Sequence, residues 1–144
     1  MVEDLRWGRC DIKSVSLLAN VLAMQEAVRA GEHEAIFVRD GRVTEGSHAA
    51  VMVVRDGVLV APPNGPEILP SVTREVVLEL AASLGIEVQL RPIPRDSLDE
   101  IEELMLLGTS KEVMPVIRVD GHPVGSGSVG PVTRRLQHAW PGGR

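Results

Sequence analysis

Aromatic residues are scarce in this sequence, and tyrosine is missing altogether. Trp7, Phe37 and Trp140 make up 2% of the 144 residues. Proteins that bind single-stranded nucleic acid need aromatic side chains on which bases stack, and a basic groove for the phosphates. The formal net charge here is −5 at pH 7, so we expect no nucleic-acid partner. The core has to be aliphatic, built from Val, Leu and Ile.

The chain also lacks the residues that make disulfides, metal sites and membrane spans. Cys10 is its single cysteine, so a disulfide within the chain is excluded, as expected in a reducing cytoplasm. The four histidines have no ligand spacing, and we expect no metal site. No apolar run approaches the roughly 18 residues of a membrane-spanning helix, and no signal-like segment opens the chain. We therefore predict a cytoplasmic protein with no membrane partner.

A chain of 144 residues is typical of one domain. Asp-Gly pairs, a strong signal for two-residue β-hairpin turns, occur three times between apolar segments. They predict hairpins centred on Asp40-Gly41, Asp56-Gly57 and Asp120-Gly121. The flanking strands are expected at 34–39, 42–45, 49–55, 58–61, 115–119 and 122–124, which gives the fold a large antiparallel component.

Apolar residues recur at helical spacing in two segments, at 17, 21, 24 and 28 and at 72, 76, 77, 80 and 84. Ser14 or Ser16 is expected to cap the first helix and Ser71 the second. Gly31 and Gly85 are expected to close them. A third helix is predicted at 132–140, because a proline at 131 suits the first helical position.

The remaining elements complete a mixed architecture. Ser97 is expected to cap a short acidic helix that runs to about residue 102. Strands are predicted at 86–93 and at 104–107, where an unbroken apolar run indicates burial. Residues 62–66 are irregular, and 141–144 form a tail. The order of elements predicts an α/β fold with a mixed, largely antiparallel sheet and helices packed on it.

Four polar positions along this chain make up the parts of a pyridoxal phosphate site. Lys13 would supply an amine that can form an imine with a carbonyl, and Glu45 a carboxylate for a protonated ring nitrogen. Residues 71–73 and 108–110 would supply donors for a phosphate, the first set at a helix N-terminus. Each has an ordinary alternative: a surface lysine, an exposed strand glutamate, a plain helix cap and a Ser/Thr turn.

The chain resembles the class IV (fold-type IV) pyridoxal-phosphate-dependent aminotransferases, and its RCDIKS segment is most similar to the D-amino-acid aminotransferase branch. Branched-chain aminotransferases and aminodeoxychorismate lyase share the scaffold. The resemblance runs over the whole chain and rests on segments in the family's order, Arg9–Ser14, Val43–Ser47, Ile68–Arg74 and Gly108–Val116, with the flanks Asp4–Trp7 and Gly130–Gln137.

The resemblance implies that residues 1–144 are the cofactor-binding C-terminal domain, a partial barrel, and that the family's N-terminal domain is absent. It implies pyridoxal 5'-phosphate as cofactor, with Lys13 as catalytic residue and Schiff-base partner. Glu45 would hold the pyridine nitrogen, and a phosphate would be bound by Ser71, Val72, Thr73 and Thr109. An amino acid, D-configured by branch, would exchange its amino group with a 2-oxo acid, in a homodimer as in the family.

Three alternatives to D-amino-acid transamination stay open. Two are other activities of the scaffold, an aminodeoxychorismate lyase and a branched-chain aminotransferase. The third is a truncated domain without independent activity. The absent domain would supply a phosphate-binding arginine, a tyrosine at the cofactor and much of the substrate pocket. We therefore expect the isolated chain to be weak or inactive.

Overall fold

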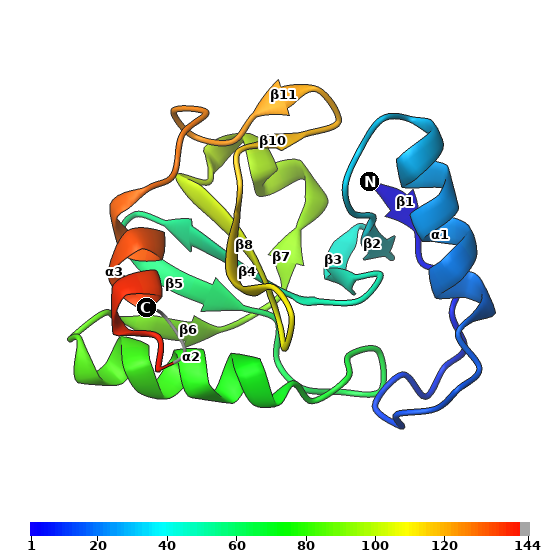
Figure 1. Cartoon of the computed structure of the whole chain (residues 1–144), viewed down its shortest axis with the longest axis horizontal. Helices are drawn as coiled ribbons and strands as arrows, with labels where there is room; N and C mark the ends of the chain where they lie inside the picture. The colour runs from blue at the N-terminus through cyan, green and yellow to red at the C-terminus, as the bar shows by residue number, and fades with distance from the viewer. Residues whose placement is uncertain (142–144) are drawn as a thin grey trace.

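The computed structural model describes residues 1–141, and most of the predicted tail, residues 142–144, lies outside that range. Two main sheets form the centre of the molecule (Figure 1). The larger sheet has five strands in the order β6 (Val88–Leu90), β5 (Val58–Ala61), β4 (Ala50–Arg55), β8 (Glu103–Gly108) and β9 (Glu112–Val116). The smaller has four, in the order β1 (Val2–Glu3), β2 (Ile36–Arg39), β3 (Arg42–Gly46) and β7 (Ile93–Pro94).

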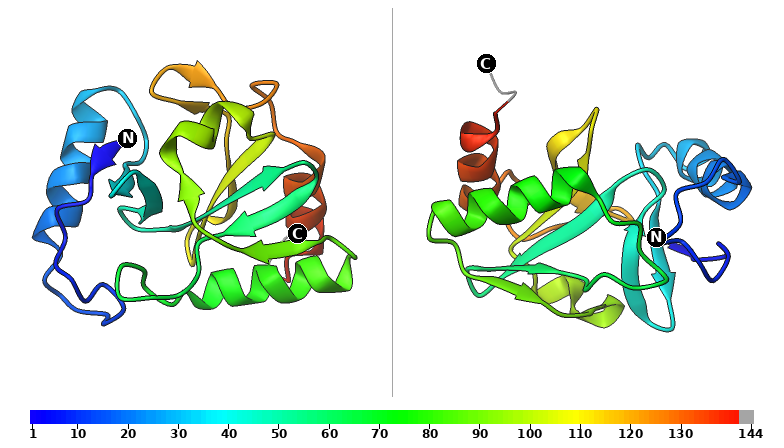
Figure 2. Two further views of the ribbon diagram at one scale, coloured as in Figure 1. Left: turned by 180° about the vertical axis from the view of Figure 1, so that it is seen from behind. Right: turned by 90° about the horizontal axis from the view of Figure 1, so that it is seen from below.

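The helices cover the outer faces of these sheets (Figure 2). Helices α2 (Val72–Ser83) and α3 (Pro131–Ala139) pack on the larger sheet. Helix α1 (Leu18–Arg29) packs on the smaller sheet. A 3-10 helix, η1 (Arg95–Glu100), follows β7, and the hairpin of β10 (Arg118–Val119) with β11 (His122–Pro123) lies at one edge. None of the helices in residues 1–141 is long and apolar enough to span a membrane.

Strand β4 shows why the core has two layers. Its residues are buried on both sides, and alternate side chains of a strand point to opposite faces. Met52 and Val54 belong to the cluster that includes α2 and α3, whereas Val51 and Val53 pack with residues of the smaller sheet. A strand buried on both faces needs a continuous apolar run, and residues 49–54 supply one.

The three predicted hairpins are confirmed. The first connects β2 to β3, the second β4 to β5, and the third β10 to β11, all antiparallel. Both turn residues have positive φ in each case, for example 48° at Asp40 and 71° at Gly41. Such turns match the natural twist of the two strands, and Asp-Gly accepts this conformation at low cost. The predicted mixed, largely antiparallel α/β class is therefore correct.

Helix α1 is present, but its cap and its packing differ from the prediction. It begins after Leu17 without a side-chain cap, so neither Ser14 nor Ser16 caps it. The residues that pack inward are Ala23 and Ala27, which lie against Phe37. These small side chains let the helix approach the sheet closely. The larger apolar residues lie elsewhere on the helix and are exposed; they are Leu18, Val21, Leu22 and Val28.

Three further boundaries and one packing position needed correction. The strand predicted at 115–119 is the end of β9 followed by β10. The strand predicted at 86–93 is two strands, because the chain leaves the larger sheet after Leu90 and joins the smaller one at Ile93. The short acidic helix starts at Arg95 and not at Ser97, whose hydroxyl donates back to the Pro94 carbonyl at 2.8 Å. Val72, predicted on the apolar face of α2, is 81% exposed at the start of that helix.

Candidate cofactor-binding site

A cavity of about 570 Å³ lies where the N-terminal segment, the two sheets and α2 meet. Its walls come from the loop before α1, the end of β3 with the β3–β4 connection, the first turn of α2, and the end of β8. These segments are far apart in the sequence, and only the fold brings them together.

All six residues singled out from the sequence line this cavity. Lys13, with an exposed side chain, comes from the loop before α1, and Glu45 comes from the end of β3. The others are Ser71, Val72, Thr73 and Thr109. The roles given to them from the sequence remain predictions, but the six positions share one space. Ser110, expected from the sequence as a further phosphate donor, does not line the cavity.

Glu45 is a buried carboxylate with specific partners. Its side chain is 8% exposed and contacts the Arg6 guanidinium. The backbone amide of Leu69 donates to the same carboxylate at 3.2 Å. Burial raises the pKa of Glu45 above its ordinary value, and the nearby Arg6 charge and hydrogen bond oppose that rise. The carboxylate therefore lies on the cavity wall with Arg6 and the Leu69 amide beside it.

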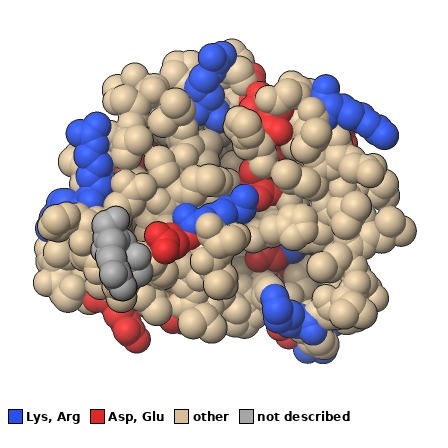
Figure 3. Space-filling model, in the orientation of Figure 1, with Lys and Arg blue, Asp and Glu red and all other residues tan. Residues whose placement is uncertain are grey.

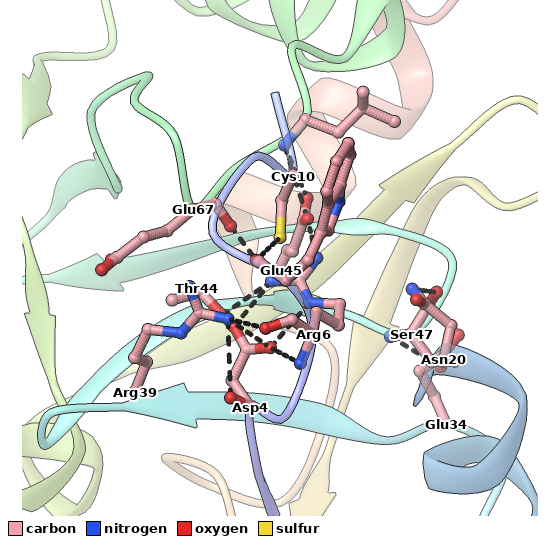
Figure 4. A network of polar contacts seen from close by, with 12 residues as sticks. Asp4, Arg6, Cys10, Asn20, Glu34, Arg39, Thr44, Glu45, Ser47 and Glu67 are labelled. Carbon is pink, nitrogen blue, oxygen red and sulfur yellow. Dashed lines mark hydrogen bonds and ion pairs between the residues drawn. The ribbon is translucent and has the colours of Figure 1, made fainter. Parts of the chain in front are cut away.

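Arg6 belongs to a buried network of charges behind this wall (Figure 4). Its Nε and Nη2 atoms each donate to Asp4 at 2.8 Å. Burial by itself would raise the pKa of Asp4, but the hydrogen bonds and charge of Arg6 outweigh it and lower that pKa. Arg39 lies 3.1 Å from the same carboxylate, and the Thr44 hydroxyl donates to it at 3.0 Å.

The first turn of α2 offers backbone donors to the cavity. The leading amides of a helix have no acceptor within it, and the helix dipole is positive at that end, so anions bind there. Ser71 caps the helix as predicted, since its hydroxyl accepts from the Arg74 amide at 3.3 Å. The buried Arg74 side chain donates to the Pro62 carbonyl at 2.7 Å and contacts Asn64, so it ties the preceding loop to the helix.

The opposite wall is fixed through Ser47. Asn20, at the start of α1, donates to the Ser47 carbonyl at 2.8 Å. The Ser47 hydroxyl contacts Glu34, and its amide donates to the same carboxylate at 3.2 Å. Lys111 lies 3.0 Å from Glu34. These contacts connect α1 to the β3–β4 connection and position the exposed His48 at the cavity edge.

Sequence reasoning missed Asp4 and Arg6 as parts of the site. Opposite charges two positions apart can lie on one face of an extended segment, but their burial here depends on the distant partners Glu45 and Arg39. The apolar neighbours Leu5 and Trp7 are 75% and 52% exposed. No three His, Cys, Asp or Glu side chains within residues 1–141 gather so as to hold a metal ion.

Comparison with known proteins identifies the family. The profile of the amino-transferase class IV family matches residues 1–119. The chain belongs to this family. D-alanine aminotransferase of Staphylococcus aureus (strain COL) is 44% identical over 139 residues, which are 96% of this chain and 49% of that protein. D-alanine aminotransferase of Bacillus licheniformis is 41% identical over 137 residues, 95% of this chain and 48% of that protein. The chain thus spans about half the length of the curated relatives it matches.

Solved structures show the same fold. The branched-chain amino acid aminotransferase of Thermobaculum terrenum, in its PLP form, superposes with a TM-score of 0.86 at 35% identity, over 91% of this chain and 44% of that one. The branched-chain amino acid aminotransferase of Escherichia coli gives a TM-score of 0.81 at 37% identity, over 92% of this chain and 48% of that one. The resemblance and the fold-type IV fold expected from the sequence are confirmed.

The residues around the cavity fit a pyridoxal phosphate by their chemistry. A lysine amine, a carboxylate and a helix N-terminus are the groups required by an aldehyde, a ring nitrogen and a phosphate. Here they line one space with a carboxylate held on its wall and helix amides at its edge.

Charged side chains of both signs are scattered over the face seen in Figure 3, without a single-sign patch.

Proposed function

We propose that this chain is the cofactor-holding part of a class IV aminotransferase, with pyridoxal 5'-phosphate in the cavity. The reaction is the transfer of an amino group from an amino acid, D-configured by preference, to a 2-oxo acid. The observation that carries the proposal is that Lys13, Glu45 and the first turn of α2 line one cavity of about 570 Å³. The identity to D-alanine aminotransferases supports the choice of substrate.

In this proposal several residues that line the cavity have specific roles. Lys13 would hold the cofactor through its aldehyde and would move the proton at the substrate α-carbon as general base and acid. Glu45 accepts a hydrogen bond from the ring nitrogen. The amides of Val72 and Thr73 and the hydroxyl of Thr109 hold the phosphate. When bound, the cofactor supplies a protonated ring that takes up the electron pair left at the α-carbon.

The test is a lysine-labelling experiment, and the modified residue is easy to assign in this sequence. Lys13 and Lys111 are the only lysines of the chain. The full chain is incubated with pyridoxal phosphate, reduced with borohydride and digested, and the modified peptide is identified by mass spectrometry. We expect the label on Lys13. Lys13→Ala is expected to abolish it.

Lys111→Gln is the matched control. Lys111 is paired with Glu34 and does not line the cavity, so this variant should label as well as the unsubstituted chain. Equal labelling of both lysines, or labelling that survives Lys13→Ala, would overturn the proposed site.

Substrate choice has a second candidate, since the solved structures quoted above are branched-chain aminotransferases. After loading with cofactor, D-alanine, L-alanine and L-leucine are compared for their ability to change the cofactor absorbance. A response to D-alanine alone supports the first candidate, and a response to L-leucine alone supports the second. Pyruvate release from aminodeoxychorismate without an amino acceptor would instead indicate the lyase of this scaffold.

We also propose that the chain acts in the cytoplasm and associates as a homodimer. Support for self-association comes from the exposed apolar residues of α1 and the segment before it, where Val15 is 98% and Leu18 is 73% exposed. Light scattering coupled to size-exclusion chromatography measures the mass. A monomeric mass at all concentrations would contradict the dimer.

A further inference from the structure

Arg6 is the most highly connected side chain around the candidate site, and nothing in the proposed reaction uses it. Its side chain is 6% exposed, and its guanidinium contacts Asp4, the Glu45 carboxylate and the Glu67 carbonyl, the last at 3.0 Å. It also lies 4.5 Å from the centre of the Phe37 ring. A guanidinium presents five donors in a rigid plane, so one arginine can fix several acceptors at once.

Asp4 holds Arg6 in this place. The Asp4 side chain is fully buried and binds Arg6 through two parallel hydrogen bonds. Such a two-point contact sets the plane of the guanidinium as well as its position. The remaining Nη1 atom then points to Glu45. Because Asp4 is anchored again by Arg39 and Thr44, the orientation of Arg6 is determined from behind the cavity (Figure 4).

Arg6 also connects the two ends of the cavity. The Glu67 carbonyl that it binds precedes Leu69, whose amide donates to Glu45. Two residues later the chain enters α2 through its cap, Ser71. One guanidinium therefore fixes both the carboxylate and the segment that leads into the candidate phosphate-binding turn.

We propose that Arg6 is a positioning residue that, anchored by Asp4, holds the Glu45 carboxylate against the ring nitrogen of a pyridoxal phosphate. This inference rests on the proposed function. Arg6 acts through Glu45. Without a cation beside it, a buried carboxylate favours its protonated form. The charged groups that act on Glu45 are Arg6 and Asp4 from the N-terminal segment, and the Cys10 thiol is close by. Arg39 from β2 contacts Asp4.

The test compares two ligands that differ only at the ring nitrogen: pyridoxal phosphate and its 1-deaza analogue, in which C–H replaces nitrogen. The unsubstituted chain should bind pyridoxal phosphate at least about tenfold more tightly, since a charge-assisted hydrogen bond is lost with the analogue. Glu45→Gln should bring the ratio of dissociation constants close to one. Arg6→Gln should lower that ratio at least about fivefold, because the hydrogen bond between Glu45 and the ring nitrogen is weakened. The exposed neighbour Arg9 supplies the control, Arg9→Gln, which should keep the ratio of the unsubstituted chain.

A second measurement needs no cofactor. With the glutamate carboxyl carbons labelled with carbon-13, nuclear magnetic resonance follows the titration of Glu45 in the cofactor-free chain. Arg6→Gln is expected to raise the pKa of Glu45 further, because the cation that opposes the effect of burial is removed. Asp4→Asn keeps the Arg6 cation and removes a negative charge that itself raises the pKa of Glu45, so it should not reproduce the rise. Compared with Arg6→Gln, Arg6→Lys should partly restore both the ratio of dissociation constants and the pKa of Glu45, because lysine keeps the charge but not the two-point contact.

The outcomes separate this inference from the proposed function. If the unsubstituted chain binds neither ligand and labels no lysine, the proposed function fails. If it binds and labels Lys13, but Arg6→Gln weakens both ligands equally and leaves the Glu45 titration unchanged, only the role of Arg6 is overturned. Loss of the folded state in Arg6→Gln, Arg6→Lys and Asp4→Asn alike would assign the network to stability alone and would also overturn it.

Discussion

Thr133 donates both its backbone amide and its hydroxyl to one carboxylate oxygen of Glu103, at 2.8 Å and 2.6 Å. The other oxygen accepts from the Val132 amide at 2.9 Å. A strand residue of β8 thus caps the first turn of α3, where a carboxylate is favoured by the helix dipole. The space it occupies is open because residue 130 is glycine; a Cβ there would overlap the Glu103 side chain.

Glu103→Gln should therefore lower the free energy of unfolding by about 1–3 kcal/mol, because a buried charged acceptor of three hydrogen bonds is replaced by a neutral amide. Chemical denaturation monitored by circular dichroism measures the change. Glu79→Gln, at an exposed position of α2, is the control and should stay within about 0.5 kcal/mol of the unsubstituted chain. An equal effect of the two substitutions would contradict the cap.

Asp4 makes stability depend on acidity in a defined direction. Its pKa in the folded chain is lowered from the ordinary 3.8 because Arg6 overcomes the effect of burial. The stabilisation is therefore present above pH 3.8 and is lost as the pH falls through the lower folded value. We expect Asp4→Asn to cost about 3–5 kcal/mol near neutral pH, with the difference shrinking in acid.

Denaturant titrations between about pH 2 and pH 6 measure that difference. Glu45 has the opposite pH dependence, because its pKa in the folded chain is raised above the ordinary 4.5. Its contribution to stability is present below pH 4.5 and is lost as the pH rises through the folded pKa. Asp99→Asn, at an exposed position, is the control and should stay within about 0.5 kcal/mol of the unsubstituted chain. A cost of Asp4→Asn that stays constant down to the lowest pH would show that the Asp4 charge is not the source of the stabilisation.

The role of Thr109 is tested with a ligand pair that differs at the phosphate. Thr109→Val keeps the shape of the side chain and removes its hydroxyl. It should weaken pyridoxal phosphate roughly tenfold, the value of a hydrogen bond to a charged group, and leave pyridoxal, which has no phosphate, unchanged. Fluorescence or absorbance titration gives both dissociation constants. Equal weakening of the two ligands would mean that Thr109 shapes the cavity without contacting the phosphate.

Cys10 is expected to react slowly with alkylating agents. It is 7% exposed, its thiol donates to the Trp7 carbonyl, and burial raises the pKa of the thiol. Iodoacetamide labelling followed by mass spectrometry should be at least about tenfold slower in the folded chain than in denaturant. Because Cys10 lines the cavity, pyridoxal phosphate should slow it further. Rapid labelling in the folded chain would contradict the packing of this segment.

Local signals accounted for much of the fold. The Asp-Gly pairs predicted all three hairpins, because few dipeptides tolerate positive φ at both positions. Ser71 marked the start of α2 correctly. The helix pattern of residues 17–28 was right about the helix and wrong about its packing face. Periodicity cannot tell which face of a helix is covered when small residues on another face allow closer contact.

The candidate site, like the fold, was predicted from the sequence only in part. The types of residue needed by a pyridoxal phosphate, including Lys13 and Glu45, are present in the sequence. Each also has an ordinary alternative, and their roles were predicted from the resemblance of their segments to the family. The sequence could not show that Asp4 and Arg6 lie inside while Leu5 and Trp7 face outward. Pairing of buried charges depends on partners far away in the chain, here Arg39 and Glu45.

The sequence by itself determined the turns, the helix at Ser71, the aliphatic core and the chemistry available to the chain, since each of these depends on residues close together. The tertiary structure decided which of the polar residues share a cavity, and it alone placed the Arg6 guanidinium between Asp4 and Glu45. That arrangement requires burial of two carboxylates and a guanidinium in one place. Burial is a property of the packed chain, because only the completed fold removes water from these charges.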